Sequence, residues 1–217
     1  KCGLFNIGAE GQYIMGSVAA VWVGWAFQGL PAIIHVTLTL LAGALAGGIW
    51  AGIVGWLKAK VGSHEVINCI MMNYVALNLS NYLIMTALNE PGKAFSYEIA
   101  PTAKLWRFAQ SFEQFKYSRL HIGIIIAIIV AIGAYYLLNK TIAGYEIRAV
   151  GFNPSASEYG GINVNQNIVL AMIISGIFAG LAGGIFTSGV QYRVNNLFGF
   201  TGYGFDGISV ALVGNNN

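Results

Sequence analysis

Two carboxylates stand at unusual places in a chain that is otherwise apolar. Glu10 lies in the stretch Asn6-Ile-Gly-Ala-Glu-Gly-Gln12, and Asp206 lies in Gly202-Tyr-Gly-Phe-Asp-Gly207. Each belongs to a glycine-rich stretch that precedes an apolar run. An ionisable group inside a membrane is costly and usually faces a cavity or a partner. Either carboxylate could therefore cap the free N–H groups of a half-helix, contact a solute directly, or do both.

Amide and phenol side chains form a second polar cluster. Tyr74, Asn78, Asn81 and Tyr82 fall at helical spacing on one face, and Asn73 lies about 100° away. Facing a translocation path, such groups would suit a polar, uncharged solute with ring character. The alternative is hydrogen bonding between helices, which asparagine commonly provides in membranes. The candidate path residues are Asn6, Glu10, Gln12, Asn73, Tyr74, Asn78 and Asp206.

The composition indicates a polytopic membrane protein. The 217 residues are 56% hydrophobic and 9% charged, whereas a soluble domain carries about 25% charged residues. The net charge of +3 is small and scattered, which argues against a nucleic-acid partner. Cys2 and Cys69 have no metal-binding spacing, so we expect no metal, no disulfide framework and no cofactor.

We expect an all-α transmembrane bundle with broken or half helices and about five to six membrane segments. A helix needs about 20 apolar residues to cross the hydrocarbon layer. The chain has no initiator Met and ends abruptly, so we expect a fragment of one transmembrane domain, 1–217. The predicted segments are 11–27, 32–57, 65–88, 122–138 and 167–189, with a sixth that begins at 207–214.

Small residues recur at every fourth position in two of these runs. They are Gly43, Gly47, Ala51 and Gly55 in the second run, and Gly176, Gly180 and Gly184 in the fifth. Small residues at this spacing line one helix face and let two backbones approach closely. We therefore expect these two helices to form the tight centre of the bundle.

Two polar segments separate the runs. Residues 89–120 should lie outside the membrane, with a short amphipathic helix around 106–115. Residues 139–165 should form a second loop, in which a helix over 144–150 is broken at Gly151 and another follows Asn153-Pro154. A compact pair of helices between two spans is typical of a docking element. The distribution of Lys and Arg slightly favours the 89–120 side as cytoplasmic.

Four motifs occur in one colinear order along the chain. They are FNIGAEGQYIMG at 5–16, SHEVI at 63–67 with MMNY at 71–74, GYEIRAVGFNPSASEYGGI at 144–162, and GYGFDGISVALVG at 202–214. Together they resemble the permease subunits of bacterial ABC importers for nucleosides, ribose-like sugars and branched-chain amino acids. The residues of these motifs are most similar to those of the nucleoside type. The departures are Ser157, where Ala is usual, and Asn215, where Arg is expected.

This resemblance implies a multi-pass protein of the bacterial cytoplasmic membrane. Residues 144–162 would be cytoplasmic coupling helices that fit an ATPase subunit, which reverses the orientation favoured by charge and places 89–120 outside. The implied partners are that ATPase, a second permease subunit, a solute-binding lipoprotein and the lipid bilayer. The implied coupling residues are Tyr145, Glu146, Arg148, Gly151, Asn153, Pro154, Tyr159 and Gly161.

Other classes of function fit the sequence less well. No phosphate-binding G-x-x-x-x-G-K-[ST] or G-x-S-x-G motif is present, and Asp206 is the only Asp, so an aspartyl dyad is excluded. We expect no enzyme. A stand-alone carrier or channel would use Glu10 and Asp206 as ion sites. If the chain is an ABC importer permease, ribose-like sugars and branched-chain amino acids stay open as alternative solutes to nucleosides. We expect Glu10 both to fix a half-helix and to help bind the solute.

Overall fold

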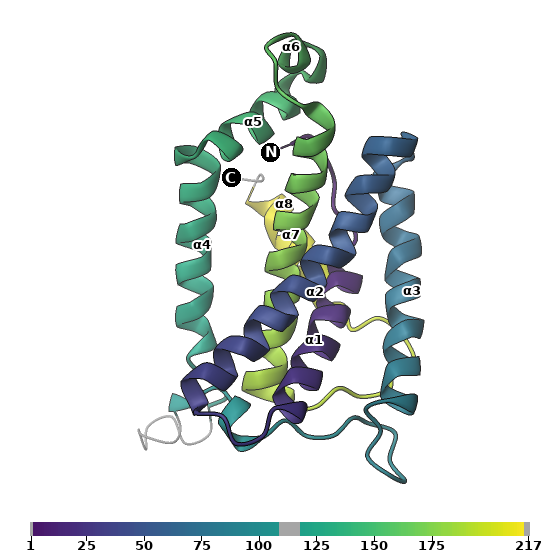
Figure 1. The fold of residues 1–217 in the computed structure, drawn as a ribbon, viewed down its shortest axis with the longest axis vertical. Helices are drawn as coiled ribbons and strands as arrows, with labels where there is room; N and C mark the ends of the chain where they lie inside the picture. The colour runs from purple at the N-terminus through teal and green to yellow at the C-terminus, as the bar shows by residue number, and fades with distance from the viewer. Residues whose placement is uncertain (1, 109–117, 215–217) are drawn as a thin grey trace.

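The structure is a computed structural model that describes residues 2–108 and 118–214, and it is an all-α bundle (Figure 1). The described residues contain isolated β-bridges but no strand. The helices are α1 (Ala9–Ala26), α2 (Ala32–Val61), α3 (Glu65–Thr86), α4 (Gly123–Lys140), α5 (Ile142–Phe152), α6 (Pro154–Tyr159), α7 (Val164–Phe186) and α8 (Tyr203–Val213), with short turns η1 (Pro101–Ala103) and η4 (Thr187–Gln191).

Glycines bring α1, α2 and α7 into backbone contact at the centre. A Cβ added at Gly47 would lie 2.3 Å from the carbonyl oxygen of Gly176, and one at Gly16 would lie 2.4 Å from that of Gly180. A Cβ at Gly180 would in turn lie 2.2 Å from the carbonyl oxygen of Gly43. Only residues without a side chain let helix backbones come this close. At Gly184, by contrast, the nearest atom is 3.6 Å away, so this position has room for a methyl group.

Three of the described helices are long and apolar enough to cross a membrane. They are α2, α4, and α7 together with its terminal turn η4. The expected segments over α1 and α3 are not among these three. Figure 1 shows α4 standing apart from the other helices, and only 6% of its apolar window is buried within the chain. Such an exposed apolar helix needs lipid or another protein around it, and the molecule is a helical membrane bundle.

Two helices begin part-way through the bundle. In Figure 1, α1 and α8 both start near the middle of the long axis and run from there toward opposite ends. Residues 2–8 precede α1 and residues 192–202 precede α8, and neither stretch is helical. Irregular backbone inside a membrane occurs only where protein or a water-filled cavity provides hydrogen-bond partners for its N–H and C=O groups. This arrangement matches the broken helices expected from the sequence.

A strap of mostly irregular chain, residues 94–105, closes one end of the bundle and includes the turn η1. Its backbone pairs with the chain that follows η4: Ser96 N–H donates to Val194 O and Ile99 N–H donates to Tyr192 O, both at 2.9 Å. The amphipathic helix expected around 106–115 falls mostly on residues 109–117, outside the described residues. The described residues of the segment 89–120 contain one short helical turn, η1.

The helix pair α5 and α6 closes the opposite end (Figure 1). The prediction that its first helix breaks at Gly151 is wrong, because α5 continues through that residue to Phe152. The break comes at Asn153, whose φ of −158° and ψ of 103° are extended. A residue before proline is pushed out of the helical region, and the Asn153 side chain then caps α6 by accepting from Ala156 N–H at 3.0 Å.

Candidate functional site

Glu10 joins the two half-helices. Its Oε1 accepts hydrogen bonds from the Thr201 hydroxyl at 2.6 Å and from Gly202 N–H at 2.8 Å, and its Oε2 accepts from Gly204 N–H at 2.7 Å. The side chain is completely buried. The carboxylate thus satisfies orphan N–H groups at the start of α8.

The cap that Glu10 forms differs from the one expected, because it acts on α8 rather than on its own helix. The N-cap of α1 is Gly8, which has no side-chain cap. The starts of the two helices touch: a Cβ at Gly204 would lie 2.4 Å from Glu10 N. Two positive helix ends therefore converge on one carboxylate, a placement that helix dipoles favour.

Asp206 does not cap its half-helix, which was one of the two roles considered for it. The N-cap of α8 is Gly202, with φ of 87°, and no side chain caps it. Asp206 lies one turn further on and is exposed, and its side chain makes no hydrogen bond or ion pair within the described residues. Glu10 instead accepts from Gly202 N–H and Gly204 N–H at this helix end.

Amide side chains hold the unwound stretch before α1. Asn6 donates from Nδ2 to Gln12 Oε1 at 3.0 Å and to Ser175 Oγ on α7 at 2.8 Å. Its Oδ1 accepts from Gly8 N–H and from Gln12 Nε2, each at 3.0 Å. Gln12 is fully buried. The hydrogen bonds of Asn6 with Gln12 and Ser175 therefore tie residues 2–8 to α1 and α7.

Two asparagines of α3 perform the same task for both unwound stretches. Asn73 donates to Ile7 O at 3.0 Å and accepts from Gly11 N–H at 2.8 Å. Asn81 donates to Leu197 O at 2.7 Å and accepts from Leu197 N–H at 2.8 Å. An amide that pairs with both groups of one residue replaces the missing helical partners. Asn73 and Asn81 thus make hydrogen bonds between elements.

Tyr74 and Asn78 lie on the outer side of α3. Both are exposed, and Asn78 donates only to its own helix, to Tyr74 O at 2.8 Å. The Tyr74 ring lies edge-on against Phe200 of the stretch before α8, with centroids 4.9 Å apart. An exposed amide on a membrane helix is poorly suited to lipid. This face is the one where the predicted polar path could lie.

A cluster of three aromatic residues at the half-helix junction was not predicted from the sequence. Tyr13 of α1, Phe186 of α7 and Tyr203 of α8 pack together, with centroid distances of 4.8 to 6.1 Å. They are 17 to 190 positions apart in the chain, so no local pattern connects them. The available signal was that Tyr13 and Tyr203 each directly follow a glycine-rich stretch.

The predicted coupling residues gather on α5, α6 and the bend that follows. Glu146 Oε2 accepts from Asn167 Nδ2 at 3.1 Å, and Arg148 donates to Asn139 Oδ1 at 3.2 Å, which ties α5 to its neighbours. Tyr145 is 60% exposed and Tyr159 is 98% exposed. Gly161 has φ of 84° and turns the chain into α7. Gly151, Asn153 and Pro154 form the end of α5 and the start of α6.

Within residues 2–108 and 118–214, no group of three or more His, Cys, Asp or Glu side chains could hold a metal ion. Cys2 and Cys69 are both buried free thiols. The chemistry that the junction offers is therefore hydrogen bonding and aromatic contact.

Comparison with known proteins connects this arrangement to transport. The family model described as the permease component of the branched-chain amino acid transport system matches residues 1–217. The guanosine ABC transporter permease protein NupP of Bacillus subtilis is 48% identical over 221 residues, which cover 100% of this chain and 61% of that protein. No solved structure matches the chain significantly.

Two further relatives carry different solute names. The nucleoside ABC transporter permease protein NupB of Lactococcus lactis is 34% identical over 223 residues, covering 100% of this chain and 61% of that protein. The glucose ABC transporter permease protein TsgB13 of Haloferax volcanii is 35% identical over 225 residues, covering 100% and 58%. The chain thus spans about three fifths of the length of these relatives.

Proposed function

The chain belongs to the family of permease components of branched-chain amino acid transport systems, and from that premise we propose that it is the membrane subunit of an ABC importer for nucleosides. The observation that carries the proposal is the junction at Glu10. Half-helices that meet inside a membrane, with unwound backbone before each, are where transporters bind their solutes. In this role the subunit performs no chemistry and guides the solute across.

The proposal of a nucleoside rests on two supports. The relative with 48% identity is named for guanosine, and another relative is named for nucleosides. The exposed face of α3 offers a phenol and an amide, Tyr74 and Asn78, which could stack on a base and hydrogen-bond to its edge. The relative named for glucose keeps a sugar as the second candidate.

We propose α5 and α6 as the element that receives the movement of an ATPase subunit. Ile147 and Val150, on the buried face of α5, pack with Cys2 in one apolar cluster. Residues 2–8 run from that cluster to the start of α1. A push on the exposed face at Tyr145 and Tyr159 could therefore reach the half-helix through a short, packed chain of contacts.

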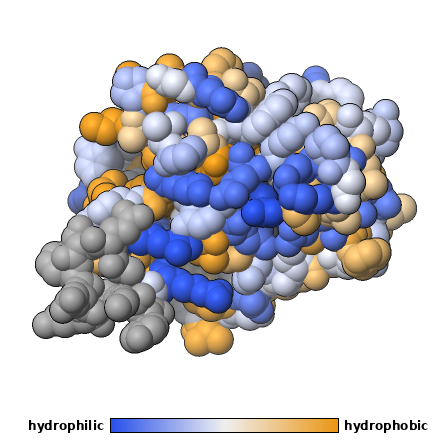
Figure 2. Space-filling model, turned by 90° about the horizontal axis from the view of Figure 1, so that it is seen from below, coloured by the Kyte–Doolittle hydropathy of each residue, from blue (hydrophilic) through white to orange (hydrophobic). Residues whose placement is uncertain are grey.

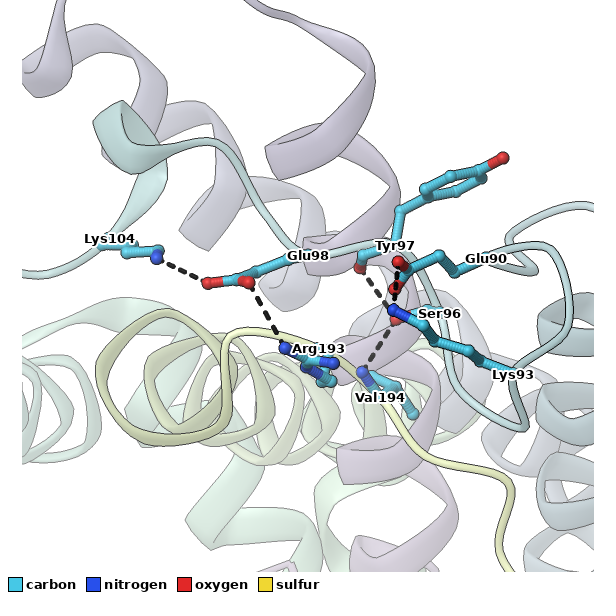
Figure 3. Close-up of polar contacts among 8 residues, drawn as sticks. All are labelled: Glu90, Lys93, Ser96, Tyr97, Glu98, Lys104, Arg193 and Val194. Carbon is cyan, nitrogen blue, oxygen red and sulfur yellow. Dashed lines mark hydrogen bonds and ion pairs between the residues drawn. The ribbon is translucent and has the colours of Figure 1, made fainter.

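The strap end is the proposed docking surface for a solute-binding lipoprotein. Figure 2 views the molecule from this end and shows strongly hydrophilic residues gathered across it. Glu98 lies between Lys104 at 2.6 Å and Arg193 at 3.3 Å (Figure 3). The hydrogen bond from Lys104 is the main cause that lowers the pKa of Glu98. The carboxylate therefore stays ionised and presents the two cations in fixed positions to an acidic partner.

Transport assays with the full-length permease and its neighbouring subunits test the function. Membrane vesicles would be offered radiolabelled guanosine, adenosine, ribose, glucose and leucine, with and without ATP. We expect ATP-dependent entry of the nucleosides only. Entry of a sugar or of leucine alone would show that the proposed solute is wrong. Entry without ATP would show that the protein is a stand-alone carrier and no ABC importer subunit.

A further inference from the structure

Tyr13 and Tyr203 lie where two cavities meet, and Phe186 lines the smaller of the two. The larger cavity has a volume of 410 Å³ and reaches along α8 as far as Ala211, on the side of α5 and α6. The smaller one has a volume of 30 Å³ and includes Gln191 and Asn195, on the side of the strap. Tyr13 and Tyr203 line both cavities. The two hollows therefore meet at these rings.

The smaller cavity is partly open, and its lining combines aromatic and apolar side chains with four polar ones. Ser17, Thr201 and the amides of Gln191 and Asn195 line it. The Ser17 hydroxyl is buried and has no hydrogen-bond partner in the structure. A cavity of this volume holds a water molecule and little more. The rings therefore stand at the narrow place between the two cavities.

We propose that Tyr13, Phe186 and Tyr203 form an aromatic gate of the solute path, which rests on the proposed function. The rings come from three different helices, and their centroids lie 5.6 Å apart for Tyr13 and Tyr203, 4.8 Å for Phe186 and Tyr203, and 6.1 Å for Tyr13 and Phe186. A movement of any one helix would open the contact. The flat ring of a nucleobase can stack on the rings that it separates.

The hydrogen bonds of Glu10 act as the latch of this gate. They hold Thr201, Gly202 and Gly204, the residues on both sides of Tyr203. Tyr203 is in the first turn of α8, and no residue of α8 is fully buried. Tyr203 also contacts the rings of Tyr13 and Phe186, so a change in the hydrogen bonds of Glu10 would shift Tyr203 directly at the gate.

Leak measurements test the gate without depending on the natural solute. The full-length permease with its neighbouring subunits would be reconstituted into liposomes, and ATP-independent efflux of labelled glycerol would be followed. We expect efflux to rise at least about fivefold in Phe186→Ala and in Tyr203→Ala, because each loses aromatic contacts that keep the passage closed. Tyr203→Phe keeps the ring and should stay tight.

Tyr136→Ala is the matched control. It also removes a tyrosine ring from a membrane helix, but Tyr136 is exposed on α4 and lines neither cavity. Co-purification with the ATPase subunit shows whether each variant assembles. Assembled Phe186→Ala and Tyr203→Ala proteins as tight as Tyr136→Ala would overturn the gate. If these variants leak but the unaltered protein takes up no nucleoside, the gate is supported and the proposed nucleoside substrate is wrong.

Discussion

Glu10 shows how one residue can be both buried and charged in a membrane protein. A lone carboxylate at this depth would be costly, but three donors from the start of α8 approach its two oxygens within 2.8 Å. Hydrogen bonds to an ionised group are short and strong. The charge is thus balanced by backbone dipoles, and no cation is needed.

The same residue also limits what the sequence could predict. A capping role was expected for Glu10, but the N-cap residue of the helix that it caps, Gly202, lies 192 positions later. Asp206 had the same local pattern, yet its side chain is exposed. Local spacing therefore identified a cap, and only the packing of α1 against α8 determined which carboxylate makes it. Direct contact of Glu10 with a solute stays a prediction.

His121 provides a pH-dependent contact outside the membrane segments. Its Nδ1 accepts from Gly123 N–H at 3.1 Å, which requires that this nitrogen carry no proton. Burial, and then the charge of Arg107, lower the pKa of His121 below its ordinary value of 6.5. The unfolded chain therefore binds a proton more readily than the folded one, and stability falls as the pH drops below 6.5.

The variant His121→Asn isolates this effect. Asparagine can accept the same hydrogen bond through Oδ1 but does not titrate. We expect the melting temperature of the purified complex to fall less in the variant than in the unaltered protein between about pH 7.5 and about pH 5.5. Equal pH dependence in both proteins would show that His121 does not contribute.

At the scale of elements, the glycines of α2 and α7 set the shape of the centre. The repeat at every fourth residue was visible in the sequence and predicted a tight contact between these two helices. α1 has the same spacing at Gly16, Ala20 and Gly24, but its part in this contact was not predicted from the sequence. Gly16 brings this third helix against Gly180 of α7.

Replacing one of these glycines tests the seam. Gly47→Ala would place a methyl group 2.3 Å from the Gly176 carbonyl oxygen, and overpacking of this kind costs about 1–3 kcal/mol. We expect a lower melting temperature and poorer assembly. Gly133→Ala on α4 is the control, since nothing lies within 4 Å of its Cβ and alanine favours a helix by about 1 kcal/mol. Equal stability of both variants would contradict the account.

At the scale of the whole molecule, length and apolar character located the main helices well. The run 32–57 became α2, which continues to Val61, and the run 122–138 became α4. These helices depend on local composition, which a sequence displays directly. The strap pairing and the aromatic gate depend on contacts between distant positions, such as Ser96 with Val194, and no local pattern reveals them.

The half-helix junction lies between the two ends of the bundle. The strap closes one end, α5 and α6 close the other, and α1 and α8 meet between them (Figure 1). The contacts of Asn6, Asn73 and Asn81 keep the irregular backbone satisfied. Glu10 is the central hydrogen-bond acceptor of this junction, and in the proposed function a movement at either end would open the path there.

The measurement that tests this account most directly is ATP-driven uptake of labelled guanosine by the full-length permease complex carrying Glu10→Gln. Glutamine offers one acceptor oxygen where three donors need two, a loss of about 1–3 kcal/mol. We predict uptake reduced about tenfold or more in a complex that still assembles. Glu90→Gln makes the same chemical change in an exposed pair with Lys93 and should transport normally. Unchanged uptake in assembled Glu10→Gln would contradict the central role of the junction.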